Sequence, residues 1–109
     1  MRKTDKKIDN ALREALTEAC NMALEKHDGF VWLTHLANYH DFPSSLVIVC
    51  VFDTNEQLAK ANVDGLRAII QDKLASIDIN LNDIRQHVRV DSEENCEKEN
   101  NGNWQKRLK

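Results

Sequence analysis

The stretch from Leu46 to Phe52 reads LVIVCVF and decides the fold class. All of its residues are apolar, and most of them are β-branched. A short run that is apolar on both faces is typical of a strand covered on each side or flanked by two neighbours. We therefore predict a central β-strand over residues 46–52.

The residues that follow this strand predict two helices that meet at a kink. Asp53 with Glu56 and Thr54 with Gln57 form two overlapping capping boxes, which favour a helix start at this point. Residues 62–65, Asn-Val-Asp-Gly, are poor helix formers, and an apolar stripe resumes after them. We expect a break at residues 62–65 and a second helix that extends to about residue 77.

The residues before the central strand predict one long helix and a first strand. Apolar residues recur in steps of three and four through residues 5–28, the stripe of an amphipathic helix, and Gly29 provides a stop. Residues 30–39 are rich in β-branched and aromatic residues, which indicates a strand, and residues 40–45 read as a loop. The helix and both strands precede the kinked helical pair.

The last predicted strand covers residues 84–91. Its residues alternate, with Ile84, Val88 and Val90 on one side and Arg85 and Arg89 on the other. Residues 92–109 form a polar tail, in which we expect a short helix after residue 92 that docks on the domain. The prediction is a single α+β domain over residues 1–91, of order α-β-β-α-α-β, with a three-stranded sheet and helices on one face.

This order of elements resembles the type II KH fold, and within it the ribosome-binding factor A family of small bacterial proteins. The KH family holds nucleic-acid backbone with a GxxG loop between its central helices, and residues 62–65 correspond to that loop with one glycine, Gly65. Members of the ribosome-binding factor A family have a kinked junction there instead. The order is also similar to that of short bacterial proteins to which no function is attached. The resemblance implies association with RNA or the small ribosomal subunit, and no site residue is carried over from it.

Composition narrows the class of protein. The chain has 109 residues, which is one small domain by the usual range of roughly 100–200 residues. It starts with charged residues, and its longest apolar run is far shorter than the roughly 20 residues of a membrane span, so we expect neither secretion nor membrane insertion. Three scattered cysteines form no CxxC pair, which favours the reducing cytoplasm.

Basic residues are the main candidates for a binding surface. They cluster at both ends of the chain and on the exposed face of the last predicted strand, and clustered Lys and Arg bind phosphate through counterion release. The alternative is that the ends are solvated and the strand arginines protect an edge from aggregation. The net charge of −3 favours the alternative. The candidates for nucleic-acid binding are Lys3, Lys6, Lys7, Arg85, His87, Arg89, Lys106 and Arg107, with Arg2 and Lys109 in the same terminal clusters.

Carboxylates suggest a third kind of site. If the second and third strands are parallel, Asp53 and Asp91 meet at one edge of the sheet, with Glu93 and Glu94 behind them. Converging carboxylates are ligands for Mg²⁺ in phosphoryl transfer. The stronger alternative is that Asp53 caps a helix and that Glu93 and Glu94 are ordinary first-turn acids.

The remaining candidates give no cofactor or catalytic group. The histidines and cysteines show no spacing typical of a metal site, and no base lies beside a thiol. Trp32 is expected in the core, whereas Trp104 in the polar tail either packs on the domain or binds a partner. The leading hypothesis is a non-enzymatic cytoplasmic binding module for RNA or the ribosome. A protein-interaction or assembly factor is the alternative, and a metal-dependent enzyme is third.

Overall fold

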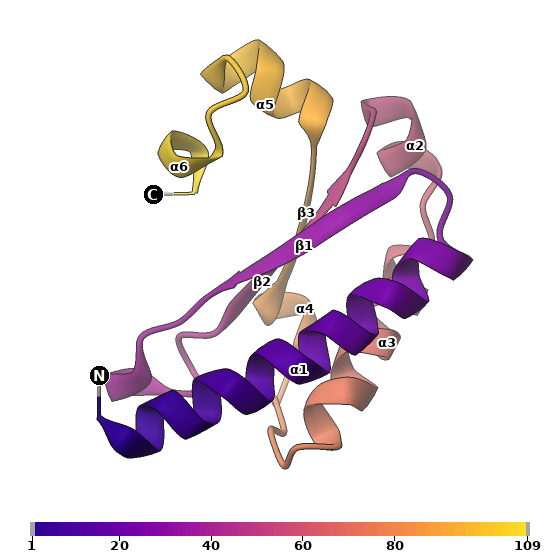
Figure 1. Ribbon diagram of the computed structural model, residues 1–109. Coiled ribbons are helices and arrows are strands. Elements are labelled where there is room, and N and C mark those ends of the chain that lie inside the picture. The colour runs from indigo at the N-terminus through magenta and orange to yellow at the C-terminus, as the bar shows by residue number, and fades with distance from the viewer. Residues whose placement is uncertain (1, 109) are drawn as a thin grey trace.

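The computed structural model describes residues 2–108 and shows an α+β fold with a three-stranded sheet (Figure 1). Lys109, one of the C-terminal basic candidates, lies outside the described residues. The elements follow one another as α1 (Lys3–Lys26), β1 (Phe30–Leu36), the 3₁₀ turn η1 (Tyr39–Asp41), β2 (Val47–Phe52), α2 (Asn55–Lys60), α3 (Val63–Ala75), α4 (Ile84–His87), β3 (Val88–Ser92), α5 (Glu93–Asn100) and α6 (Trp104–Arg107). The predicted fold class is confirmed.

The sheet has the order β1-β2-β3, so the apolar strand β2 lies in the middle as predicted. β1 pairs with β2 antiparallel, and β2 pairs with β3 parallel. Parallel neighbours need a crossover connection, and α2 and α3 provide it. The side chains of Ile48, Cys50 and Phe52 are fully buried on the face that carries the main core.

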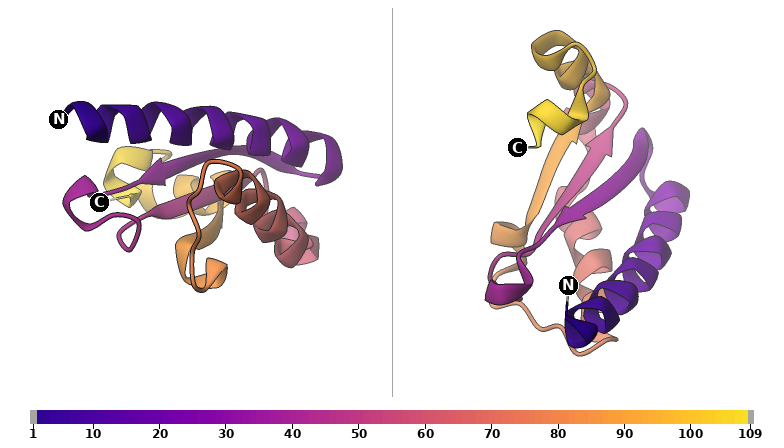
Figure 2. Two further views of the ribbon diagram at one scale, coloured as in Figure 1. Left: turned by 90° about the horizontal axis from the view of Figure 1, so that it is seen from below. Right: turned by 60° about the vertical axis from the view of Figure 1, so that its left-hand side comes forward.

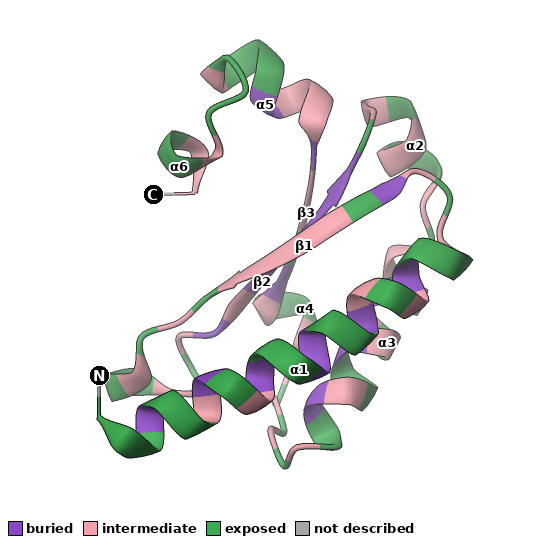
Figure 3. Ribbon diagram, in the orientation of Figure 1, coloured by how far each residue is buried: buried purple, intermediate pink, exposed green. Residues whose placement is uncertain are grey.

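Helices α1 and α3 pack side by side on that face of the sheet (Figure 2). The buried residues of α1 fall on one side of the helix, and the opposite side is exposed (Figure 3). Leu12, Leu16 and Ala19 of this stripe join the core, which explains the apolar periodicity of the sequence. Gly29 has a φ of 83°, which suits the turn between α1 and β1.

The crossover has the predicted kink, but one predicted cap is wrong. Thr54 is the N-cap of α2, and its side chain accepts a hydrogen bond from the backbone N–H of Gln57. Asp53 is exposed and precedes the cap. Of the two predicted capping residues, Thr54 therefore caps the helix and Asp53 does not. Asn62 caps α3 by accepting from the N–H of Gly65, which places the break at the expected residues.

Two predicted strand boundaries are also wrong. β1 ends at Leu36, and residues 39–41 form the turn η1. The predicted strand 84–91 begins instead with the single helical turn α4, because the side chain of Asp83 accepts from the backbone N–H of Arg85 and caps a turn there. Only β3, from Val88 onward, is a strand.

The C-terminal residues cover part of the second face of the sheet. α5 starts directly after Ser92, whose side chain accepts from the N–H of Asn95, at the place where a short helix is expected. The chain then turns back, and Trp104 of α6 packs edge-to-face on Trp32 of β1 with 4.9 Å between ring centroids. Figure 1 shows α5 and α6 on the side of the sheet away from α1.

Candidate functional site

The basic residues near β3 do not share a strand face. Arg85 lies on α4, where its guanidinium contacts the carboxylate of Asp83 with 3.1 Å between Nε and Oδ1. The Nδ1 atom of His87 lies 2.7 Å from the backbone carbonyl oxygen of Leu46. Arg89, on β3, is exposed. The three residues therefore occupy two elements, and the predicted strand face that carries all of them is wrong.

The basic residues of the two chain ends differ in their surroundings. Lys3, Lys6 and Lys7 lie exposed on the first two turns of α1, and no ion pair to them occurs in residues 2–108. Lys106 is also exposed on α6. Arg107, in contrast, is mostly buried and is held by carboxylates of its own chain.

Arg107 fixes α6 to the end of β3. Its Nε and Nη2 donate to the two carboxylate oxygens of Asp91 at 2.5 and 3.0 Å, and its Nη1 donates to Glu99 and Asn100. Burial alone would raise the pKa of Asp91, but hydrogen bonds from Arg107 and from the N–H of Ser92 hold it below its usual value. The hydrogen bonds that Arg107 donates to Asp91 and Glu99 raise the pKa of its guanidinium group. This ion pair connects two parts of the chain and leaves neither group free for a ligand.

The predicted carboxylate edge is present, but three of its carboxylates, Asp91, Glu93 and Glu94, are held by contacts within the chain. Because β2 and β3 are parallel, Asp53, directly after β2, and Asp91, next to the last residue of β3, lie at the same edge of the sheet. Glu93 accepts from the indole N–H groups of Trp32 and Trp104, at 2.5 and 3.2 Å. Glu94 accepts from the backbone N–H of Asn55. No group of three or more residues suited to hold a metal ion occurs in the described part of the chain.

The three thiols are free. Cys50 and Cys96 are buried, and Cys20 is partly buried. Burial raises the pKa of Cys50 to about 12, so its thiol is protonated near neutral pH. These cysteines act as small core side chains.

A polar cluster joins α1, β1 and η1. The hydroxyl of Tyr39 donates to the buried carboxylate of Asp9 at 2.5 Å, and Arg13 and His35 contact the same carboxylate at 2.8 and 3.5 Å. The hydrogen bond from Tyr39 lowers the pKa of Asp9, and burial together with that bond raises the pKa of Tyr39 to about 12. The ring of Tyr39 stacks on Phe42, 5.4 Å between centroids. The cluster therefore positions Phe42, which lines an apolar cavity.

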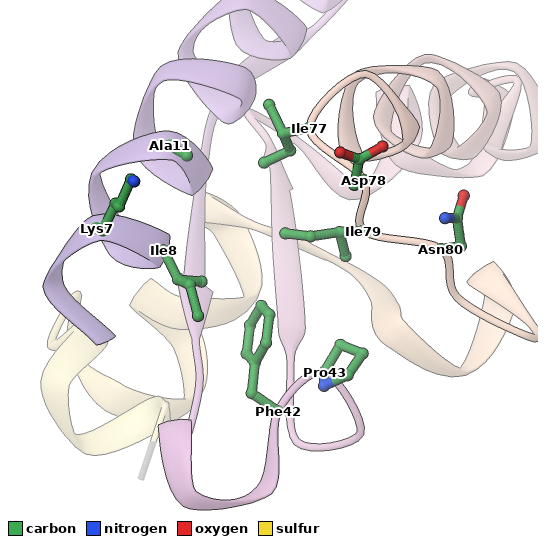
Figure 4. Close-up of a pocket in the computed structure, with 9 residues that line it drawn as sticks. All are labelled: Lys7, Ile8, Ala11, Phe42, Pro43, Ile77, Asp78, Ile79 and Asn80. Carbon is green, nitrogen blue, oxygen red and sulfur yellow. The ribbon is translucent and has the colours of Figure 1, made fainter. Parts of the chain in front are cut away.

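An apolar cavity of about 520 Å³ lies beside the first turns of α1 (Figure 4). Figure 4 shows Ile8, Phe42 and Ile79 pointing toward one another across it. The chain turns after α3 because Asp78 takes a left-handed φ of 63°, and Ile77 and Ile79 on either side of it both line the cavity. The full lining comprises Lys7, Ile8, Ala11, Phe42, Pro43, Ile77, Asp78, Ile79 and Asn80.

The rim of the cavity is charged on the side of α1. Lys3, Lys7 and Ala11 are spaced by four residues, which places them on the same side of the helix, and Lys7 and Ala11 line the cavity. Asp78 lies across from Lys7, and in Figure 4 its side chain turns away from Phe42. A volume of several hundred Å³ with mostly apolar walls and few polar groups is typical of a ligand or anchor pocket.

Comparison of the chain with protein-family models, with curated proteins and with solved structures gave no match. Within residues 2–108, no helix combines the length and the apolar character needed to cross a membrane.

Proposed function

We propose that this protein is a small non-enzymatic binding module that recognises a segment of a partner protein at the cavity beside α1. The observation that supports this proposal is the cavity itself. Its walls come from three separate parts of the sequence and are mostly apolar. The other polar groupings, around Asp91 and around Asp9, are occupied by contacts within the chain. The proposal corresponds to the protein-interaction hypothesis from the sequence.

The chemistry of the cavity defines the partner segment. Ile8, Phe42 and Ile79 offer room for one large apolar side chain, the kind of buried anchor that carries most of the energy of an interface. Lys3 and Lys7 favour carboxylates next to that anchor. The expected ligand is a short acidic segment that contains a Leu, Ile, Met, Phe or Trp.

The place of action in this proposal is the cytoplasm. Its support is that all three cysteines are free thiols, two of them buried in the core, which suits a reducing compartment.

The test is selection of binding peptides from a phage-displayed library of random sequences on the purified protein. We expect enriched peptides that combine acidic residues with a large apolar residue. Their binding should weaken at least about tenfold in Lys3→Glu with Lys7→Glu, and this loss should shrink at high salt. The matched control is Lys26→Glu with Lys106→Glu, which reverses two charges at other exposed positions and should bind as the wild type does.

Amide chemical shifts complete this test. On addition of a selected peptide, we expect the largest changes at residues 7–11, 42–43 and 77–80. Failure to enrich any peptide would contradict the proposal. So would shift changes confined to β3, or equal binding by the Lys3→Glu, Lys7→Glu variant.

Association with RNA or the ribosome is the second candidate function. It is favoured by the exposed Lys3, Lys6, Lys7 and Arg89, to which no carboxylate partner occurs in residues 2–108, and by the KH-like order of elements. Co-sedimentation with ribosomal particles at low salt tests it. Binding that falls steeply with salt and is lost in Lys3→Glu with Lys7→Glu would support this candidate. Loss of this binding in the variant Arg85→Glu with Arg89→Glu would place the RNA near β3 instead.

A further inference from the structure

β1 is an edge strand with an unusual composition. It forms one border of the sheet, and its residues, FVWLTHL, include no Asp, Glu, Lys or Arg. The free edge of a strand presents unpaired N–H and C=O groups that can pair with another strand. Native proteins generally protect such edges with charged residues, prolines or covering elements. β1 contains no charged residue and no proline, and in Figure 1 no other element passes in front of it.

The opposite edge of the same sheet is protected. β3 is shorter and carries the exposed Arg89 as its second residue. The backbone carbonyl of Val88 accepts a hydrogen bond from Nη2 of Arg67 at 3.2 Å. Asp91 is bound by Arg107 of the C-terminal residues. The contrast between the two borders points to β1 as the edge that is available for pairing.

Apolar side chains are exposed at both ends of β1. Val31 is 40% exposed and Leu36 is 42% exposed, and they are two of the three exposed large hydrophobic residues in the described chain. A bulge interrupts the pairing between Phe30 and Trp32, but from Trp32 to Leu36 the strand pairs regularly with β2. This regular part can receive a further strand on its free side.

A crevice runs beside this edge between β1 and α1. Its lining includes Thr17, Cys20 and Asn21 from α1 and Leu33 and His35 from β1, and no residue of β2 or β3. Its volume is about 560 Å³. The crevice provides space for side chains of a strand that is added to β1.

We infer that the strand added at this edge is β1 of a second copy of the protein, paired antiparallel about a two-fold axis. A strand without charges meets its own copy without like-charge repulsion. Antiparallel pairing brings the end of β1 with Val31 in one copy next to the end with Leu36 in the other copy. This contact occurs at both ends of the paired strands, so both exposed apolar residues are covered in each copy. Two-fold dimers with such self-complementary surfaces are the commonest oligomers of soluble proteins. The result is one continuous six-stranded sheet, and this dimer is independent of the cavity beside α1.

Sedimentation equilibrium over a range of protein concentrations tests the dimer. The wild type should approach twice the chain mass at high concentration. Val31→Lys with Leu36→Lys places a charge at each end of β1 and should raise the dissociation constant at least about a hundredfold, because charged residues on an edge oppose pairing. Gln71→Lys with Gln86→Lys adds the same two charges at exposed positions on α3 and α4 and should dimerise as the wild type does.

Hydrogen exchange of the wild type tests the dimer without any variant, so the result does not depend on whether the Val31→Lys, Leu36→Lys variant folds. Amide groups on the free edge of β1 should exchange more slowly as concentration rises, while those of β3 should not change. A wild type that stays monomeric at all concentrations would overturn the inference. Dimerisation by the Val31→Lys, Leu36→Lys variant, or concentration-dependent protection confined to other elements, would also overturn it.

Discussion

At the start of α2, a single hydroxyl group holds the helix cap although a carboxylate stands next to it. Thr54 accepts from the N–H of Gln57, and Asp53 is exposed. We expect Thr54→Ala to lower the free energy of unfolding by about 1 kcal/mol, the usual value of an N-cap. Asp53→Ala should change it by less than about 0.5 kcal/mol. Urea unfolding of both variants decides the matter, and the reverse ranking would return the cap to Asp53.

Tyr39 is the only tyrosine of the chain, so its titration can be followed directly. Its pKa is raised from 10.0 to about 12, mainly by burial and then by the hydrogen bond to Asp9. A raised pKa in the folded state contributes stability that is complete below pH 10 and is lost as the pH rises toward 12. Ultraviolet absorbance should therefore show a midpoint near 12 in the folded protein and near 10 in urea. Asp9→Asn should lower the folded midpoint, and an unchanged midpoint would refute the assigned hydrogen bond.

At the scale of elements, one arginine connects α6 to β3. Arg107→Ala leaves the partly buried carboxylate of Asp91 without its main partner, so we expect a loss of about 2 kcal/mol in the free energy of unfolding. Lys106 is exposed on the same helix, and Lys106→Ala should change stability by less than about 0.5 kcal/mol. Thermal unfolding of the two variants gives the comparison. Equal stabilities would mean that the ion pair contributes nothing.

The helices and strands also show which sequence patterns are sufficient to predict an element and which are not. The long stripe of α1 and the apolar run of β2 are strong signals because burial of whole faces depends on them. The alternation in residues 84–90 is short, and the side chain of Asp83 offers the backbone a helical turn that competes with a strand. Val88 therefore begins β3, whereas Arg85 belongs to the turn. A local cap outweighs a weak period-two pattern there.

At the scale of the whole molecule, the central strand β2 is buried on both faces of the sheet, so packing on the second face also contributes to stability. Val49 points away from the main core but is only 4% exposed. We expect Val49→Ala to cost about 1–3 kcal/mol in the free energy of unfolding, because the site is close-packed. Leu36, at 42% exposure, is the control, and Leu36→Ala should cost clearly less. A urea midpoint that Val49→Ala leaves unchanged would show that this face is loosely packed.

The cavity beside α1 belongs to this scale as well, which explains why sequence reasoning missed it. Its walls come from residues 7–11, 42–43 and 77–80, and no local pattern connects these three segments. The sequence does carry one relevant signal, the spacing of Lys3, Lys7 and Ala11 on one side of a helix. That signal indicates a charged side of α1, but only the folded chain brings Phe42 and Ile79 next to it.

The contact between Trp32 and Trp104 has a spectroscopic consequence. The chain has only these two tryptophans, and both donate to the carboxylate of Glu93. All of the intrinsic indole emission therefore arises from one place, the junction between the sheet and the C-terminal helices. A denaturation curve followed by this emission reports the disruption of that junction, whereas far-ultraviolet circular dichroism reports all the helices, of which α1 is the longest. Separation of the two curves would measure directly how independently the C-terminal helices detach from the rest of the fold.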